Sequence, residues 1–261
     1  MKLIFDEKVA AKEFTTLLKL TDNICIITGA GISTSSGIPD FRGEEGIYTK
    51  SDKNVFDLNH FKKNPKLFYE FAKDFLNILK ESQPNSAHIL IKKLEDMGKV
   101  KAVITQNIDG LHRKAGSKNL YEVHGTFENF QCLNCKKAYK LNDIFNTIKN
   151  GEVPLCKECG GILKPDVVFF GERIDANLIN QIKNIASQSE YCIVIGSSLI
   201  IHPVASIPEY TLNNDGRLII INRGETPYDE YAYKKFDVDI EEFSKAVLKN
   251  IKKKFLLFRP L

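Results

Sequence analysis

Short runs rich in isoleucine and valine recur along the chain, and they limit the possible folds more than any other feature of the sequence. The runs show little alternation of apolar and polar residues, which is typical of parallel strands covered by helices on both faces. Five runs are expected to be strands of one sheet: Ile24 to Thr28, Val100 to Thr105, Asp166 to Phe170, Tyr191 to Ile195 and Arg217 to Ile221.

Amphipathic helical patterns lie between these runs. Their apolar faces extend over Phe68 to Leu79, Ala87 to Leu94, Leu178 to Ile185 and Ile240 to Ile251. Asn64, Asp175 and Asp239 stand where N-caps are expected, and Glu242 would complete a capping box with Asp239. Strands that alternate with helices predict an α/β fold, in which a Rossmann-like parallel sheet has helices on both faces.

Two stretches interrupt this alternation. Residues 128–164 contain four of the six cysteines and are expected to form a small inserted module. Residues 42–64 are polar and irregular, which predicts a mobile loop over a site. The expected division is therefore a Rossmann-like domain from residues 1–41, 76–127 and 165–261, a loop and helical segment of a small lobe from residues 42–75, and the module at 128–164.

Glycine or small polar residues follow every predicted strand. Ligands of doubly wound folds bind beyond the carboxyl ends of the strands, so these residues meet at one edge of the sheet. Polar loops are ordinary after any single strand, but five in succession favour a ligand cleft. The segments are Gly29-Ala30-Gly31-Ile32-Ser33, Thr105-Gln106-Asn107-Ile108-Asp109, Phe170-Gly171-Glu172, Gly196-Ser197-Ser198 and Asn222.

The loop after the first strand matches a dinucleotide-binding fingerprint only in part. Gly29 and Gly31 are present, but Thr34 occupies the position of the third glycine. A tight strand-to-helix turn explains the two glycines about as well. No acidic residue ends a second strand about twenty residues later, as dinucleotide-binding dehydrogenases usually show. The pattern therefore disfavours ordinary hydride transfer.

Four cysteines have the spacing of a zinc ribbon. Cys132 and Cys135 form one C-x-x-C pair, and Cys156 and Cys159 form a second pair twenty residues further on. Two such pairs supply four thiolates in a tetrahedron. Because four protein ligands close the coordination sphere, the zinc is expected to be structural, one ion per chain, and a zinc hydrolase is disfavoured.

Other polar residues allow two interpretations on local grounds. His124 precedes the cysteine-containing insert and follows a short apolar run, so it can face the cleft as a base or be a structural histidine. Asp40, Phe41 and Arg42 open the irregular segment. Arg42 can pair with a phosphate and Phe41 can shield a reactive centre, but an ion pair within the loop explains the arginine equally well.

The ordered set of these motifs resembles the sirtuins, most closely those of bacteria and archaea. The set spans about residues 20 to 242. It consists of Gly29-Ala30-Gly31-Ile32-Ser33, Gly37-Ile38-Pro39-Asp40-Phe41-Arg42, Thr105-Gln106-Asn107-Ile108-Asp109, His124-Gly125, the two C-x-x-C pairs, Lys164 to Phe170, Phe170-Gly171-Glu172 and Gly196-Ser197-Ser198.

The resemblance implies a set of site residues. NAD, consumed as a co-substrate, would contact Ala30, Gly31, Ile32, Thr34, Phe41, Arg42, Gln106, Asn107, Ile108, Asp109, Gly196, Ser197, Ser198, Asn222, Asp239 and Ile240. The acyl-lysine peptide would contact Val168, Phe170, Gly171, Glu172 and Ile201, and its backbone would add as a strand beside the Ile201-His202-Pro203 segment. A common Val-Gln-Pro is replaced here by Ile-His-Pro, and Asp239 is explained equally well as a helix cap.

The resemblance also implies the reaction. An NAD-dependent protein-lysine deacetylase would use His124 as general base and release nicotinamide and O-acetyl-ADP-ribose. Sirtuin-type ADP-ribosyl transfer is the nearest alternative, and a Rossmann oxidoreductase is less favoured. The lysines are scattered and the net charge is only +4, so no direct nucleic-acid binding is expected. No apolar run could span a membrane and the N-terminus lacks a signal sequence, so a cytoplasmic location is expected.

One helix bears on the choice of acyl group. Sirtuins that prefer acidic acyl chains are similar to one another in having a tyrosine and, three residues later, an arginine beside the acyl-lysine tunnel. The matching positions here are taken as Tyr69 and Ala72, and Lys73 is expected to face away. Acetyl or other neutral acyl groups are therefore expected to be preferred over succinyl.

Overall fold

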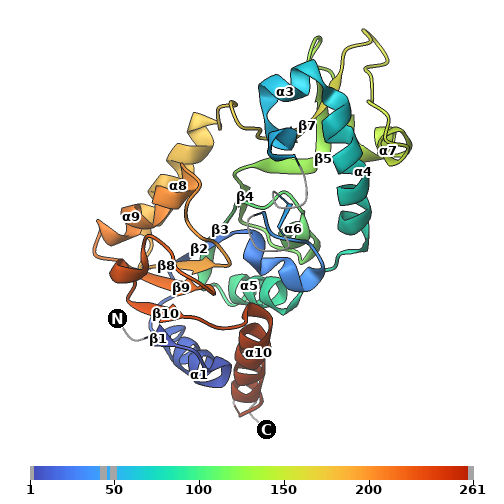
Figure 1. Ribbon diagram of the computed structural model, residues 1–261. Coiled ribbons are helices and arrows are strands. Elements are labelled where there is room, and N and C mark those ends of the chain that lie inside the picture. The colour runs from blue at the N-terminus through green and yellow to red at the C-terminus, as the bar shows by residue number, and fades with distance from the viewer. Residues whose placement is uncertain (1–2, 42–45, 48–51, 258–261) are drawn as a thin grey trace.

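The computed structural model describes residues 3–41, 46–47 and 52–257 (Figure 1), and the larger of two sheets in this part of the chain has seven strands. Every neighbouring pair in that sheet is parallel. Its order is β1 (Leu3–Ile4), β10 (Lys234–Phe236), β9 (Arg217–Ile221), β8 (Tyr191–Ile195), β2 (Ile24–Thr28), β3 (Val100–Thr105) and β4 (Leu120–Glu122). Four of the five predicted strands, β2, β3, β8 and β9, are confirmed with the expected bounds.

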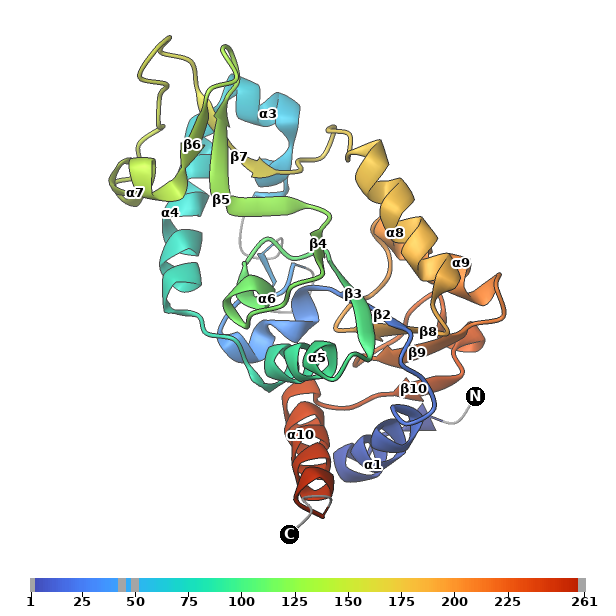
Figure 2. The same ribbon diagram turned by 180° about the vertical axis from the view of Figure 1, so that it is seen from behind.

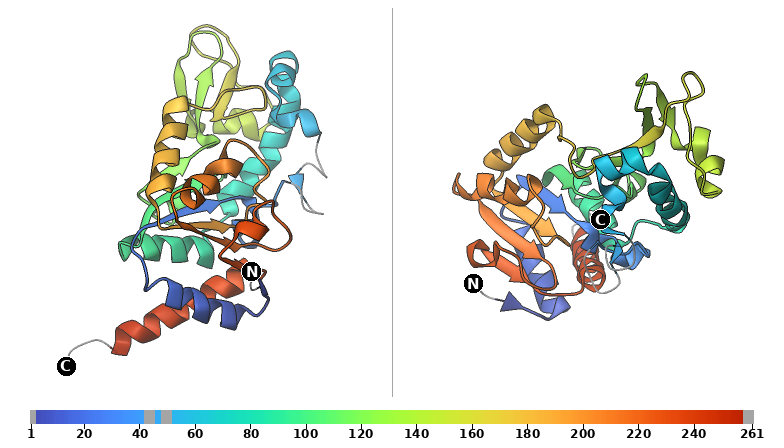
Figure 3. Two further views of the ribbon diagram at one scale, coloured as in Figure 1. Left: turned by 90° about the vertical axis from the view of Figure 1, so that its left-hand side faces the viewer. Right: turned by 45° about the horizontal axis from the view of Figure 1, so that its top comes forward.

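Helices cover both faces of this sheet, as predicted (Figures 1 and 3). On one face Ile26 and Ile193 pack with α1 (Glu7–Leu17), α5 (Ser86–Asp96) and α10 (Ile240–Leu257). On the other face Ile27 and Val194 pack with α8 (Ala176–Gln188) and α9 (Ile207–Leu212). Because alternate residues of a strand point to opposite faces, the central strands must be apolar at every position, which explains their unbroken Ile/Val runs.

The fifth predicted strand, Asp166–Phe170, is wrong both in its bounds and in its sheet. The observed strand is β7 (Leu163–Val167), which is antiparallel to β5 (Gly125–Cys132) in a smaller sheet completed by β6 (Ala138–Lys140). Figure 2 shows this sheet beside α3 (Leu58–Lys63), α4 (Pro65–Glu81) and α7 (Leu141–Lys149). Within the run only Val167 and Phe169 are buried, whereas Asp166 and Phe170 are exposed, and an apolar run does not specify which strand becomes the partner.

The second stretch that was expected to be irregular is partly helical. Residues 53–56 form a 3-10 helix and α3 follows directly, with Asp57 capping it through a hydrogen bond from the His60 backbone N–H at 2.7 Å. Phe56, Phe61 and Phe68 are buried together in an aromatic core under the smaller sheet. Residues 42–45 and 48–51 of the predicted mobile loop lie outside the described residues.

The predicted helix caps are confirmed only in part. The Asp175 side chain accepts a hydrogen bond from the Asn177 N–H at the start of α8. Asn64 precedes α4 but makes no side-chain cap. Asp239 accepts from the Glu242 N–H at 3.0 Å, whereas its own N–H donates to Glu7 and not to Glu242. No helix in the described part of the chain is long and apolar enough to cross a membrane.

Candidate active site

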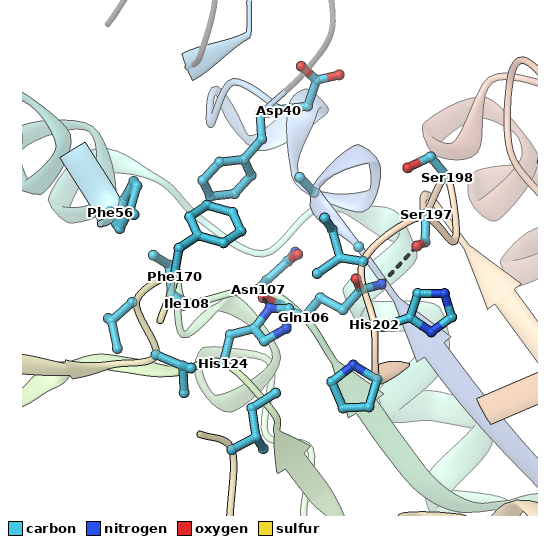
Figure 4. Close-up of a pocket in the computed structure, with 18 of the residues that line it drawn as sticks. Asp40, Phe56, Gln106, Asn107, Ile108, His124, Phe170, Ser197, Ser198 and His202 are labelled. Carbon is cyan, nitrogen blue, oxygen red and sulfur yellow. Dashed lines mark hydrogen bonds between the residues drawn. The ribbon is translucent and has the colours of Figure 1, made fainter. Parts of the chain in front are cut away.

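A cavity of about 710 Å³ lies where the loops after β2, β3, β8 and β9 approach the segment after β7 (Figure 4). Its volume falls within the range of about 300–1,000 Å³ that is usual for small-molecule sites. Sixteen of the residues expected to bind cofactor or substrate, or to act as base, line it: Ala30, Gly31, Phe41, Gln106, Asn107, Ile108, His124, Val168, Phe170, Gly171, Glu172, Gly196, Ser197, Ser198, Ile201 and Asn222.

Five expected cofactor residues in the described part of the chain do not line this cavity, and a sixth, Arg42, is not described. Ile32 is buried in the core beside α5, and the Thr34 hydroxyl donates a hydrogen bond to the Gly31 carbonyl oxygen. Asp109 is buried and lines a different, smaller cavity. The two remaining described residues, Asp239 and Ile240, lie at the start of α10.

Eleven further residues line the cavity. Six of them belong to motifs already named from the sequence: Gly29, Asp40, Val167, Phe169, His202 and Pro203. No site role was predicted for the other five: Phe56, Arg173, Ile174, Ile179 and Arg223. Arg173 and Arg223 directly follow residues that were selected, so extending each motif by one residue would have found them. Phe56 had no signal of its own. Its carbonyl accepts a hydrogen bond from the Phe170 N–H at 2.7 Å, a long-range contact that brings it to the cavity.

The two glycines of the first loop are required by contact between loops. A Cβ at Gly31 would lie 3.0 Å from the Gly196 Cα, and a Cβ at Gly29 would lie 2.8 Å from the Gly196 carbonyl oxygen. The Gly31 N–H also donates to the Gly196 carbonyl at 2.9 Å. The loops after β2 and β8 therefore pack directly against each other and form the floor of the cavity. A side chain at Gly29 or Gly31 would push the two loops apart.

Buried polar side chains connect the first loop to the loop after β3. The Ser33 hydroxyl donates to Asp109 Oδ2 at 2.8 Å, and Asn107 Nδ2 donates to Ser33 Oγ at 3.1 Å. Asp109 Oδ1 accepts from the Leu111 N–H at 2.8 Å. Both oxygens of Asp109 are thus occupied, so it fixes Asn107 through Ser33 and leaves Asn107 to face the cavity.

His124 has one ring nitrogen committed to the backbone. Its Nδ1 lies 2.9 Å from the Gln106 carbonyl oxygen, and because a carbonyl only accepts, Nδ1 carries the proton. The neutral ring then has an unprotonated Nε2 that can accept a proton. Burial lowers the pKa of His124 below 6.5, opposed in part by this hydrogen bond. Gln106 is held in turn by Ser197, through the 2.8 Å bond drawn in Figure 4.

Lys164 fixes the wall formed by the segment after β7. Its Nζ donates to Glu172 Oε2 at 2.8 Å and to the Val167 carbonyl at 2.7 Å, and it lies 4.1 Å from the centre of the Phe169 ring. Glu172 Oε2 also accepts from the Phe169 N–H at 2.7 Å. The Glu172 carboxylate is therefore occupied by contacts within this segment and does not face a substrate. The backbone around Gly171 is the exposed part of this wall.

The helix that was expected to flank an acyl-lysine tunnel, α4, contributes no residue to the described cavity lining. Tyr69 and Ala72 are buried in the core and do not line the cavity. The Tyr69 hydroxyl donates to the Leu163 carbonyl, and burial raises its pKa far above 10. Lys73 lies on another face of α4, against Gly151, as expected.

The four paired cysteines form a separate cluster at the far end of the smaller sheet. Their Sγ atoms all lie within 4.8 Å of one another, with Cys132 and Cys159 3.5 Å apart and Cys135 and Cys156 3.6 Å apart. A tetrahedral zinc with Zn–S bonds of about 2.3 Å needs sulfurs roughly 3.8 Å apart, so the donor set fits this ion. A Cβ at Gly161 would lie 2.8 Å from Cys132 Sγ, which explains the glycine there.

Comparison with known proteins agrees with this geometry. Residues 29–203 match the model of the Sir2 family. An NAD-dependent protein deacetylase of Thermotoga maritima is 44% identical over 91% of this chain and 96% of its own length, and one of Sulfolobus acidocaldarius is 44% identical over 92% and 95%.

Solved structures give the same result. A Sir2 enzyme with a deacetylated p53 peptide and 3′-O-acetyl-ADP-ribose superposes with a TM-score of 0.87 at 43% identity, covering 92% of this chain and 97% of that one. A Sir2 structure with p53 peptide and NAD⁺ gives 0.86 at 41% identity, covering 93% and 98%. The chain belongs to the Sir2 family.

Proposed function

We propose that this protein is an NAD-dependent protein-lysine deacetylase that releases nicotinamide and O-acetyl-ADP-ribose. The single observation that carries the proposal is His124, whose Nδ1–H is fixed by the Gln106 carbonyl and whose Nε2 is left to accept a proton inside the cavity. Relatives that match more than nine-tenths of the chain are named NAD-dependent protein deacetylases, which supports the same reaction.

The cavity has groups suited to each part of NAD. When bound, this co-substrate supplies an electrophilic ribose carbon and nicotinamide as the leaving group. The Gly29–Gly31 loop offers backbone close to the phosphates, while Ser198 and Asn222 are placed for the adenosine half. Asn107 can donate to and accept from the nicotinamide carboxamide, held in place by Ser33 and Asp109.

His124 moves the proton in this scheme. Its Nε2 accepts a proton from a ribose hydroxyl, which makes that oxygen nucleophilic toward the acyl group, and the Gln106 carbonyl stabilises the imidazolium that results. Gln106 is itself positioned by Ser197, so the orientation of the base depends on the loop after β8 as well as on the loop after β3.

The acyl-lysine peptide binds between the segment around Gly171 and the segment Ile201–Pro203. Within the described residues, the backbone of Gly171 has no hydrogen-bond partner, so its N–H and C=O are available to an extended peptide. Val168 and Phe170 supply the apolar wall beside the lysine stem, and Ile201 supplies the opposite wall.

The remaining assignments follow from the site. A zinc ion held by Cys132, Cys135, Cys156 and Cys159 is structural, because four thiolates leave no coordination position for a substrate.

We place the protein in the cytoplasm, where a reducing environment keeps these thiols available. The proposed division of labour is NAD binding by residues 1–41, 76–127 and 165–261, a cofactor loop and small-lobe helices in 42–75, and zinc binding by 128–164.

Mass spectrometry of an acetyl-lysine peptide, incubated with the zinc-loaded enzyme with and without NAD, tests the function. We expect NAD-dependent loss of the acetyl group together with equimolar nicotinamide and O-acetyl-ADP-ribose. His124→Ala is expected to bind NAD and to lose at least a hundredfold in turnover, which is the usual contribution of a general base. An intact acetyl group with ADP-ribose added to protein would instead identify a transferase.

A further inference from the structure

The described residues at the peptide end of the cavity include a positive charge, on Arg173, that no carboxylate neutralises. Glu172 is neutralised internally, because its Oε2 accepts from Lys164 at 2.8 Å and from the Phe169 N–H at 2.7 Å. Arg173, the next residue, is exposed and lines the cavity. Among the described residues no carboxylate forms an ion pair with Arg173. The wall beside Gly171 therefore carries the Arg173 guanidinium, and the adjacent carboxylate, Glu172, is already paired with Lys164.

His202 supplies a second hydrogen-bond donor from the opposite wall. Figure 4 shows its ring near Ser197 and Gln106, and the residue lines the cavity. In the part of the chain that the structure describes, the ring makes no side-chain hydrogen bond. An imidazole carries at least one N–H in either protonation state, so it can donate to a carboxylate.

Other nearby charges do not cancel this arrangement. Asp175 accepts the Asn177 N–H as the cap of α8. Asp40 has an interaction of its own and lies away from His202 in Figure 4. Arg223, the other arginine among the lining residues described, pairs with Asp239 at 3.4 Å. Among the described lining residues, Arg173 and His202 are therefore two side chains, one on each wall, that can donate to a bound peptide.

We propose that Arg173 and His202 select substrates in which acidic side chains flank the acyl-lysine. The inference rests on the proposed function, because it requires an extended peptide between these two walls. Alternate side chains of an extended peptide point to opposite sides, so residues next to the acyl-lysine can face one wall or the other. A carboxylate there gains a charge-assisted and often bidentate contact with the guanidinium, which an amide or an ammonium group does not provide.

Three acetyl-lysine peptides that differ only in the flanking residues test this selection. One carries Asp and Glu, the second Asn and Gln, and the third lysines. We expect kcat/KM for the acidic peptide to be about fivefold higher than for the amide peptide and higher still than for the lysine peptide, through KM and not kcat. Raising the ionic strength is expected to reduce the difference, because exposed charges are screened.

Charge reversal locates the effect. Arg173→Glu is expected to favour the lysine peptide over the acidic one, and His202→Gln to reduce the acidic preference by about twofold without reversing it. Lys12→Glu makes the same charge change on the exposed side of α1 and serves as the matched control, with an unchanged ratio. Each variant is judged by the ratio of kcat/KM between the acidic and the lysine peptide. A general loss of activity lowers both values and leaves this ratio unchanged.

The outcomes separate this inference from the proposed function. Deacetylation of all three peptides at equal efficiency overturns the selection and leaves the function intact. An acidic preference that survives Arg173→Glu unchanged also overturns the assignment. Failure to deacetylate any of the peptides in the presence of NAD contradicts the proposed function itself.

Discussion

A backbone carbonyl determines which nitrogen of His124 can accept a proton, and burial determines the pH range in which it does so. The pKa of His124 lies below 6.5 because burial disfavours the imidazolium. A base is active when deprotonated, so activity is expected to persist as the pH falls through 6.5 and to decline only below it. A plot of kcat/KM for an acetyl-lysine peptide against pH measures this loss of activity at low pH. A midpoint above pH 7 would contradict the assignment of His124 as the base.

Asp109 was predicted to line the nicotinamide pocket, and in the structure it is linked to the cavity only through Ser33 and Asn107. Both of its oxygens are occupied by Ser33 and the Leu111 N–H, so it acts on the cavity through Asn107. Asp109→Asn places an amide N–H where the Ser33 hydroxyl now donates, which reverses that hydrogen bond and releases Asn107. We expect nicotinamide base exchange and inhibition to weaken about tenfold, equivalent to ~1.4 kcal/mol, with little change in peptide KM.

Ser33→Ala is the comparison for this prediction. It removes the same link from the other side, so it is expected to reproduce the nicotinamide defect. Equal losses in nicotinamide and peptide affinity in Asp109→Asn would show a general folding defect instead of a local one.

At the scale of elements, the zinc module shares its apolar core with the rest of the small lobe. Ile144 and Ile148 of α7 are buried in the cluster that also contains Phe75 and Leu79 of α4. Losing the ion is therefore expected to destabilise the lobe as well as the module.

Elemental analysis is expected to find about one zinc per chain, and Cys132→Ala to lose the metal and lower Tm. Cys25→Ala is the matched cysteine control, because this thiol is buried in the parallel sheet and should retain full zinc content when replaced. Folded, active protein without metal would contradict a structural role for zinc.

The acyl preference depends on which face of α4 each side chain occupies. Tyr69 and Lys73 both lie outside the cavity lining, and the apolar end of the cavity is formed by side chains such as Phe56, Val167 and Ile108. Among the described residues, Lys164 is the cation beside this end, and its amine is engaged with Glu172. Arg173 lines the cavity at the wall beside Gly171, where the peptide is proposed to bind, so an acidic acyl chain would be desolvated here without a free cation from the described residues to offset the cost.

We therefore expect kcat/KM for an acetyl peptide to exceed that for the matching succinyl peptide at least tenfold, about 1.4 kcal/mol. Lys73→Ala is the control and is expected to leave this ratio unchanged. Comparable rates with the two peptides, or a ratio that depends on Lys73, would show that a cation does reach the acyl group.

The same elements show how far the sequence could predict the structure. Strands β2, β3, β8 and β9 were predictable because strands covered on both faces must be apolar throughout. β7 was assigned to the wrong sheet because its partner, β5, is chosen by tertiary contacts that no local pattern encodes. β1 and β10 have only two and three residues and were missed, because so short a segment carries no periodic signal.

The candidate site follows the same rule. Residues within contiguous motifs, such as Gln106 and Ser197, were found because strand ends converge on one edge of a parallel sheet. Phe56 was missed because a hydrogen bond to Phe170, 114 positions later, brings it to the cavity (170 − 56 = 114). The tight strand-to-helix turn predicted as the alternative for Gly29 and Gly31 is present, because β2 ends at Thr28 and a 3-10 helix begins at Ala30. Close contact with Gly196 is a second reason for the two glycines, and it has no local signal in the sequence.

At the scale of the whole molecule, the cavity exists only when segments distant in sequence are assembled. Gly31, Gln106, Ser197 and Asn222 come from four separate loops. NAD should therefore bind the folded chain and not the unfolded one, and at a hundredfold excess over Kd it stabilises by ~2.7 kcal/mol. For a chain of this size that corresponds to a rise in Tm of roughly 5–10 °C.

Gly31→Ala tests whether contact between the loops after β2 and β8 is needed for this coupling. The added Cβ would lie 3.0 Å from the Gly196 backbone, so the loops must separate and the cofactor floor must widen. We expect a lower Tm without NAD and, in addition, a smaller rise when NAD is added. Gly98→Ala is the matched control, because Gly98 has φ +73 and no neighbour within 4 Å of an added Cβ. It should lower Tm through backbone strain alone and keep the full NAD-induced rise. If both variants retain that rise in differential scanning calorimetry, the loop contact contributes to folding but not to binding NAD.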